Sequence, residues 1–265
     1  LRHWVFARSV QILEPLGGQK GKGADLQLKM TEPDDLLRLK QEYADRKTRV
    51  DGKRLYSRFN PAHLYALQHR ERDTLALIKP WVGSDLSQRR ILEVGCGSGG
   101  ILLEYLLYGV QPKNLFGLDI LFDRLNEAKT KIPAASILNA NGELIPFRNS
   151  SFDMVLQYTA FSSILDPAIK KHMAQEMLRV LKSDGFIIWY DFWLNPTNKQ
   201  TKGIQPAEIK ALFPNCKIQF RKVTLAPPLA RRIVPLSWTA AAVVESLRVL
   251  NTHYLALIRP GFDKN

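Results

Sequence analysis

The sequence predicts an α/β fold in which a mostly parallel sheet carries helices on both faces. Short apolar segments alternate with helical segments between Arg90 and Asp191, and this alternation is typical of parallel sheets. A glycine cluster follows the first of these segments, where such folds bind their ligands. The chain has 265 residues, of which 45% are hydrophobic and 24% charged. It is therefore long enough for one large domain with an extension.

Residues 1–55 are interpreted as an N-terminal extension that contains a flexible linker and a helix. The linker, LGGQKGKGA at 16–24, is rich in glycine and lysine. The first residues do not resemble a secretory signal, because Arg8 interrupts them and no small-residue cleavage site follows. A helix is expected over 32–50, where an aspartate can cap its first turn.

The domain itself is expected to span 56–265. It should begin with a helix over 61–79 whose apolar side chains Leu64, Leu67, Leu75 and Ile78 face inward. The strands expected after it cover 90–94, 115–120, 136–138, 152–157, 186–191, 217–223 and 254–258. The helices expected between the strands cover 101–108, 121–131, 167–182 and 238–250.

The net charge of +13, from 38 Lys and Arg against 25 Asp and Glu, raises the question of an anionic partner. The surplus is uneven: residues 61–150 carry a net charge of +1, whereas 1–60 carry +5 and 151–265 carry +7. Since no run of five or more basic residues occurs, we favour a solvated basic surface. No apolar run reaches the roughly 18 residues of a membrane-spanning helix. Two cysteines are too few for a disulfide scaffold or a structural zinc site, and no metal is expected.

The segment ILEVGCGSGG, residues 91–100, is the strongest chemical signal in the sequence. Glycines let the backbone turn sharply and let a ligand approach closely, and the following helix presents free N–H groups at its start. Asp119 stands 19 residues after Gly100, at the end of the second expected strand. A carboxylate at that position can accept both hydroxyl hydrogens of a ribose, so the sequence predicts a nucleoside-type ligand.

Two cofactors compete for this pattern. Gly95-x-Gly97-x-x-Gly100 fits the dinucleotide fingerprint, with Asp119 at the right distance for NAD. Three other features favour S-adenosylmethionine. Glu93 lies two residues before the first glycine, where a carboxylate suits an ammonium group better than a pyrophosphate. The other two are the segments NANGELIPFRNSSFDMV (139–155) and EMLRVLKSDGFIIWYD (176–191), which follow in order.

Together these three segments resemble the class I S-adenosylmethionine-dependent methyltransferases, in particular their small-molecule subgroup. The resemblance covers roughly residues 56–191. It implies a Rossmann-like seven-stranded methyltransferase sheet with helices on both faces. The N-terminal helical extension would precede this sheet, and residues 225–252 would form a lid-like insertion before the last strand.

The resemblance also implies which residues hold S-adenosylmethionine. The glycines would cradle its methionine part, Glu93 would support the amino group, and Asp119 would bind the ribose. Asn141 stands where the family commonly has an aspartate, and its amide oxygen and the N–H of Gly142 would still serve the adenine. The implied cofactor-binding residues are Glu93, Gly95, Gly97, Gly99, Asp119, Ile120, Asn141, Gly142 and Tyr56.

The acceptor is expected beside the carboxyl ends of the fourth and fifth strands. Methyl transfer depends mainly on positioning, and aromatic rings there would favour a flat or apolar acceptor. The alternative interpretation of these rings is core packing. The predicted acceptor-binding residues are Tyr158, Phe161, Trp193 and, in the insertion, Trp238. A base is needed only for a hydroxyl of high pKa, and the catalytic candidates are Tyr158, His63 and His253, with His69 as a further one.

The sequence therefore predicts methyl transfer to a small-molecule acceptor, with O-methylation of a hydroxyl in natural-product, glycan or lipid biosynthesis favoured. Four alternatives stay open: C-methylation of an isoprenoid or quinone-type acceptor, RNA methylation, a non-methylating relative that binds the cofactor, and an NAD enzyme. RNA methylation is disfavoured because QYTAF replaces the Asn/Asp-Pro-Pro-aromatic segment of adenine methyltransferases. We expect a cytoplasmic monomer or homodimer, with peripheral contact to a membrane left open. For the insertion we favour a lid over a dimer contact or a helix resting on a membrane.

Overall fold

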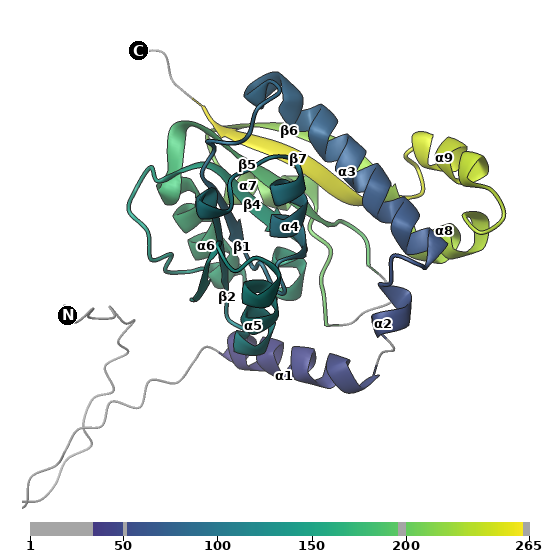
Figure 1. The fold of residues 1–265 in the computed structure, drawn as a ribbon, viewed down its shortest axis with the longest axis horizontal. Coiled ribbons are helices and arrows are strands. Elements are labelled where there is room, and N and C mark those ends of the chain that lie inside the picture. Colours follow the sequence, from purple (N-terminus) through teal and green to yellow (C-terminus); the bar gives the residue numbers. More distant parts are fainter. Residues whose placement is uncertain (1–33, 50–51, 196–199, 262–265) are drawn as a thin grey trace, which may run out of the picture.

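The computed structural model of the chain describes residues 34–49, 52–195 and 200–261. The linker expected over 16–24 lies outside these residues. A seven-stranded sheet with the order β3-β2-β1-β4-β5-β7-β6 occupies the centre (Figure 1). Strands β1 to β5 are parallel to one another, whereas β7 runs antiparallel to both β5 and β6. The predicted seven-stranded α/β class is confirmed.

The elements follow the predicted alternation. The strands are β1 (Ile91–Val94), β2 (Leu115–Asp119), β3 (Ser136–Asn139), β4 (Phe152–Tyr158), β5 (Leu181–Phe192), β6 (Cys216–Leu225) and β7 (Asn251–Pro260). The helices are α1 (Asp34–Arg49), α2 (Gly52–Leu55), α3 (Pro61–Val82), α4 (Gly100–Leu107), α5 (Phe122–Lys131), α6 (Pro167–Val180), α7 (Pro206–Leu212), α8 (Pro227–Ile233) and α9 (Trp238–Ser246). Two 3₁₀ turns, Pro112–Asn114 and Phe161–Ser163, complete the chain order.

The inner strands of the sheet are buried on both faces, which explains why β1, β2 and β4 are nearly continuous apolar runs. Side chains alternate along each strand, so that Ile187 and Trp189 join the core beneath α6 and α7. Their neighbours Phe186 and Ile188 join the core beneath α3, α4 and α5. The carboxyl ends of the parallel strands therefore lie between two core layers, one on each face of the sheet.

Helix α3 differs from the prediction in length and orientation. It continues through Pro80 to Val82, and of the four apolar side chains expected inward only Ile78 is buried. Leu75 is 37% exposed, while Tyr65 and Thr74 are buried in its place. The apolar pattern gave the wrong face because this helix covers a polar part of the interior, described below.

The region between β5 and β7 also differs from the prediction. Helix α7 was not predicted, and the insertion forms two helices, α8 and α9, where the sequence suggested one over 238–250. The prolines at the start of α8 favour a first helical turn. Helix α9 ends early, and Arg248, two residues beyond it, has a φ of 58° that no continuing helix adopts.

Helix α1 packs on the carboxyl edge of the sheet rather than standing apart from the domain (Figure 1). Leu36 is buried in the core beneath α6. The Asp35 carboxylate accepts the N–H groups of Leu165 and Asp166 at 2.7 and 3.0 Å. Arg38 donates to the carbonyl of Ser163 at 2.5 Å. The helix is thus tied to the loop that follows β4.

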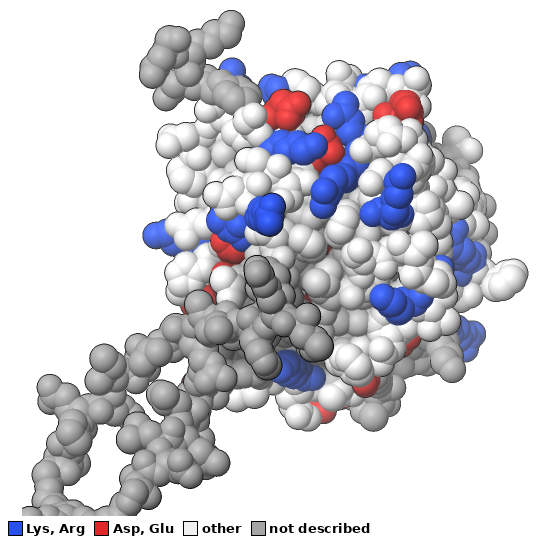
Figure 2. Space-filling view, turned by 60° about the vertical axis from the view of Figure 1, so that its left-hand side comes forward, with Lys and Arg blue, Asp and Glu red and all other residues white. Residues whose placement is uncertain are grey.

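The basic residues do not merge into one patch on the face that Figure 2 shows, where Lys and Arg side chains lie scattered between uncharged residues. This distribution fits the solvated basic surface that the sequence predicts. Among the described residues, none of the helices is both long and apolar enough to span a bilayer. Within the same residues, no cluster of three or more His, Cys, Asp or Glu side chains is arranged to hold a metal ion.

Candidate functional site

The glycine loop connects β1 to α4 at the carboxyl edge of the sheet. Gly95, Gly97 and Gly99 have φ values of 76°, 49° and 74°, in the left-handed region that favours glycine. A Cβ at Gly95 would lie 2.7 Å from the Cβ of Ala160, and one at Gly97 would lie 2.5 Å from the Arg124 guanidinium. The backbone conformation therefore favours glycine at all three positions, and at Gly95 the close approach of Ala160 excludes a side chain as well.

Asp119, at the end of β2, closes the loop from the neighbouring strand. Its carboxylate is buried and accepts the N–H of Gly97 through Oδ2 at 2.8 Å and the N–H of Leu121 through Oδ1 at 2.9 Å. Each carboxylate oxygen can accept a second hydrogen bond. The geometry thus leaves acceptor capacity for the two hydroxyls of a ribose.

Glu93 places a buried carboxyl group beneath the loop. Its side chain is 2% exposed, and its Oε2 has no hydrogen-bond partner among the described residues. Burial raises the pKa of Glu93 well above its usual value, and the carboxylates of Glu104 and Asp119 raise it further. Three carboxylates thus face two guanidinium groups, those of Arg70 and Arg124, around this point. An unpartnered carboxylate oxygen in such surroundings fits a ligand that brings a positive charge.

The adenine end of the predicted site is already hydrogen-bonded. The amide oxygen of Asn141 accepts the N–H of Glu143 at 3.0 Å, and its Nδ2 donates to the Glu143 carboxylate at 3.1 Å. Gly142 packs closely on Met173, and Ile120 is half-buried against the core. Tyr56, which we predicted over the methionine part, is 68% exposed and meets the ring of His63 edge-on. The roles of these four residues stay predictions.

Sequence reasoning missed a buried polar cluster between α3, α4 and the sheet. Arg70 forms an ion pair with Glu104, and its guanidinium carbon lies 5.6 Å from the ring centres of both Tyr158 and Tyr190. The Nε of Arg70 is buried and has no partner within the described chain. One feature of the sequence could have indicated this cluster: Arg70 and Thr74 are four residues apart and therefore lie on the same face of the helix.

Tyr158 and Phe161, which we both predicted to bind the acceptor, point into different layers of the core. Burial raises the pKa of Tyr158 to about 12, with Arg70 opposing the shift. Its hydroxyl therefore keeps its proton at neutral pH. Phe161 is wholly buried in the core, with its ring centre 4.6 Å from that of Trp189. Phe161 is therefore a core residue in this structure.

The predicted tryptophans lie nearer the end of the sheet formed by β6 and β7. The Nε1 of Trp193 donates to the carbonyl of Asn251 at 2.8 Å, and the Lys222 ammonium lies 4.2 Å from its ring centre. Trp238 is 40% exposed and meets the ring of Tyr65 edge-on. None of these ring contacts joins either tryptophan to Tyr158.

The histidine candidates differ in their surroundings. His253 is buried with its ring stacked on Tyr190, and burial, with a smaller contribution from Arg70, lowers its pKa to about 3. It is neutral at pH 7 but only a weak base. Burial and two nearby guanidinium groups also lower the pKa of the half-buried His63. His69 contacts the Glu245 carboxylate through Nδ1 at 2.7 Å.

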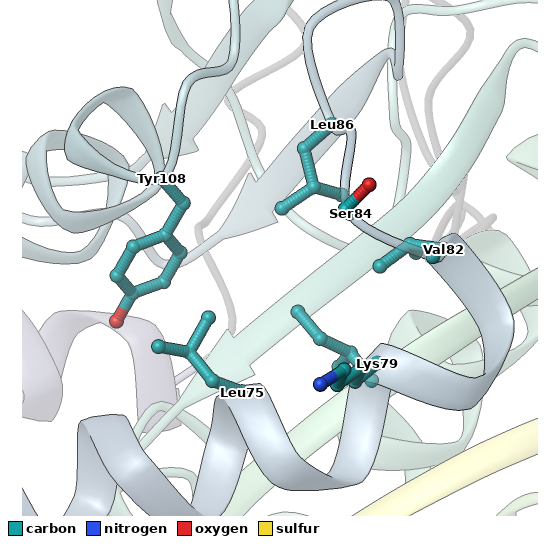
Figure 3. A pocket seen from close by; sticks show the side chains of 8 residues that line it. Leu75, Lys79, Val82, Ser84, Leu86 and Tyr108 are labelled. Atoms are coloured by element: carbon teal, nitrogen blue, oxygen red, sulfur yellow. The ribbon is translucent and has the colours of Figure 1, made fainter.

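A separate cavity of about 290 Å³ lies at the amino edge of the sheet (Figure 3). Tyr108 faces Leu75 across it, and Lys79 and Val82 line it from α3. It contains none of the predicted site residues.

The family comparison agrees with this geometry. Residues 92–189 match the model of a family described as "Methyltransferase domain". This stretch includes the glycine loop, Asp119, all of β4 and most of β5. Over this stretch the chain is similar to a methyltransferase domain. The site fits S-adenosylmethionine, because the Oε2 of Glu93, which has no partner among the described residues, and the glycine cradle suit its charged methionine part.

Curated relatives match this domain over part of their length. The phthiotriol/phenolphthiotriol dimycocerosates methyltransferase 1 of Mycobacterium ulcerans is 33% identical over 117 residues, which are 43% of this chain and 41% of the relative. The fatty-acid O-methyltransferase of Mycolicibacterium smegmatis is 32% identical over 110 residues, or 41% and 39%. The chain thus spans about two fifths of the length of these relatives.

A solved structure shows the same fold over more of the chain. It comes from the complex between the Haloferax volcanii Trm112 methyltransferase activator and the putative methyltransferase. The match has a TM-score of 0.56 at 18% identity and covers 86% of this chain and 100% of that chain. At this identity the likeness supports the fold alone.

Proposed function

We propose that this chain transfers a methyl group from S-adenosylmethionine to an oxygen atom of a small, lipid-like acceptor. The observation that carries the proposal is the buried Oε2 of Glu93, which has no hydrogen-bond partner among the described residues. The printed names of the two relatives support an apolar acceptor, since one is a fatty-acid O-methyltransferase and the other methylates dimycocerosates.

On the cofactor side of the site, the residues of the chain bind and orient S-adenosylmethionine. Glu93 accepts a hydrogen bond from the ammonium group, the Asp119 carboxylate accepts from the ribose hydroxyls, and the glycine loop admits the methionine part. Once bound, the cofactor supplies an activated methyl group on a sulfonium. Rate acceleration then depends on holding the acceptor oxygen in line with that group.

The acceptor side favours an oxygen that is already ionised. Tyr158, with its pKa of about 12, keeps its proton, and His253, with a pKa of about 3, binds one only weakly. Arg70 places a buried cation beside both Tyr158 and Tyr190, with its Nε unpartnered within the described residues. A carboxylate needs no base and would be oriented by Arg70 and the Tyr158 hydroxyl. We therefore narrow the predicted hydroxyl acceptor to a carboxylic acid.

The test uses methyl-labelled cofactor and a panel of acceptors with matched chain lengths. Fatty acids are compared with the corresponding alcohols, and phenols and quinols are included. We expect the label in base-labile methyl esters of the acids. Label only in alcohol ethers or on ring carbon would refute the carboxylate assignment. Calorimetry that detects no binding of millimolar S-adenosylmethionine would refute methyl transfer altogether.

A further inference from the structure

The α8–α9 insertion exposes six large apolar side chains. We call these residues, with the arginines named below, the α8–α9 surface. Leu236 is 87% exposed and Leu247 67% exposed. Contiguous exposed apolar side chains on a folded domain mark sites of interaction. The exposed apolar members of this surface are Leu236, Trp238, Val243, Leu247, Val249 and Leu250.

The charges of the α8–α9 surface are all positive. Arg231, Arg232 and Arg248 are exposed. The one carboxylate between residues 226 and 250, Glu245, is 7% exposed and turned inward. It accepts the Tyr65 hydroxyl at 2.5 Å and contacts His69. The surface therefore complements an anionic partner, and Glu245 fixes it to α3 before any partner binds.

The α8–α9 surface borders the edge of the sheet that holds the site. Strands β5 and β6 both run antiparallel to β7 and hence parallel to each other. The carboxyl end of β6, from which α8 departs, therefore lies at the same edge as the ends of β4 and β5. Helix α8 packs on the start of α3 (Figure 1), and just before that start Phe59 is 99% exposed. An apolar acceptor held at this surface would enter the domain at the correct end.

We propose that the α8–α9 surface binds the face of an anionic lipid bilayer. Its apolar side chains enter the interfacial layer while its arginines contact lipid phosphates, as in other amphipathic interfacial segments. The membrane then presents acyl-chain acceptors at the carboxyl edge of the sheet. That last step rests on the proposed function, whereas bilayer binding itself does not.

The test is flotation of the full chain with vesicles of phosphatidylcholine alone or mixed with phosphatidylglycerol. We expect binding to the anionic vesicles that weakens with added salt. Each basic residue near an anionic surface contributes about 1 kcal/mol, so removing two lowers binding roughly thirtyfold. Arg231→Glu with Arg232→Glu should lower it at least that much. Leu236→Ser with Leu247→Ser should lower it without changing the charge.

The matched control is Lys113→Glu with Lys129→Glu, which changes the net charge equally at exposed positions near β2 and on α5. This variant should float nearly as well as the unchanged chain. Absence of flotation by the unchanged chain would overturn the inference, as would equal loss in the control and arginine variants. A dimer that Leu236→Ser dissociates would reassign the surface to a second copy of the chain.

The two proposals fail separately. Calorimetry with S-adenosylmethionine and methyl transfer to a short, water-soluble acid do not depend on the α8–α9 surface. If the chain floats with anionic vesicles but methylates no acceptor, the proposed function fails and the bilayer inference stands. If it methylates the soluble acid but does not float, the bilayer inference fails and the proposed function stands.

Discussion

Replacing Glu93 by Gln should weaken cofactor binding and stabilise the cofactor-free protein. The substitution keeps the shape of the side chain but removes a buried carboxylate whose Oε2 has no partner among the described residues. In the complex that oxygen would accept a charge-assisted hydrogen bond from the ammonium group. Such bonds contribute roughly 1.5–3 kcal/mol. We therefore expect the dissociation constant of S-adenosylmethionine to rise about 10- to 150-fold in calorimetry.

The pH dependence of this variant gives an independent readout. Burial raises the pKa of Glu93, so the folded free protein holds a proton that the unfolded chain has already lost. Its free energy of unfolding should therefore fall as the pH rises above the unfolded pKa of about 4.3. Because glutamine does not ionise, Glu93→Gln does not lose free energy of unfolding in this way. At pH 8 it should therefore melt at a higher temperature than the unchanged protein.

Cofactor affinity should change with pH in the opposite sense. An ammonium group binds the ionised carboxylate, so binding releases the proton and affinity rises with pH through the folded pKa. The rise is at most about tenfold per pH unit for one proton. The exposed Glu127→Gln serves as the control, with unchanged affinity and melting temperature. Unchanged affinity in Glu93→Gln, or a lower melting temperature without cofactor, would contradict the role assigned to Glu93.

Three further predictions follow from the same geometry. Asp119→Ala removes the acceptor of two backbone N–H groups and of the ribose, so calorimetry should detect no cofactor binding; retained affinity would refute the ribose assignment. Arg70→Lys keeps the charge but loses the Nε donor and should lower kcat/KM for carboxylate acceptors about tenfold or more, with cofactor affinity unchanged; equal losses on alcohols would indicate a purely structural role. Glu245→Gln should lower the free energy of unfolding by about 1–3 kcal/mol at pH 7. Hydrogen bonds from His69 and Tyr65 lower the pKa of Glu245 against the effect of burial, so its contribution is lost as the pH falls through the folded pKa. Urea unfolding at pH 7 and pH 4 should show the variant's deficit shrinking at the lower pH.

The cofactor side of the site was predictable because its signals are local in the sequence. Gly95, Gly97 and Gly99 follow one strand directly, and Asp119 ends the next. Adjacent parallel strands bring these ends together whatever the rest of the fold does. Spacing alone therefore predicted where each of these residues lies.

The acceptor side was not predictable to the same degree, because it depends on how distant elements pack. Arg70 contributes to the site only because α3 turns its polar stripe inward and leaves Leu75 on the surface. Phe161 was misplaced because a 3₁₀ turn follows β4 and directs its ring into the opposite core layer. Neither helix orientation nor the exit angle of a strand follows from apolar periodicity alone.

Comparing the binding of the cofactor and of its product would show which cationic group of the cofactor Glu93 faces. The chain carries +13, yet around Glu93 three carboxylates face two guanidinium groups. S-adenosylmethionine brings an ammonium and a sulfonium, whereas its product S-adenosylhomocysteine keeps only the ammonium. If Glu93 faces the ammonium, Glu93→Gln should weaken both ligands by the same factor. A loss confined to S-adenosylmethionine would instead assign Glu93 to the sulfonium, beside the reacting methyl group. The ratio of the two dissociation constants, measured in both proteins, therefore locates the carboxylate without a bound structure.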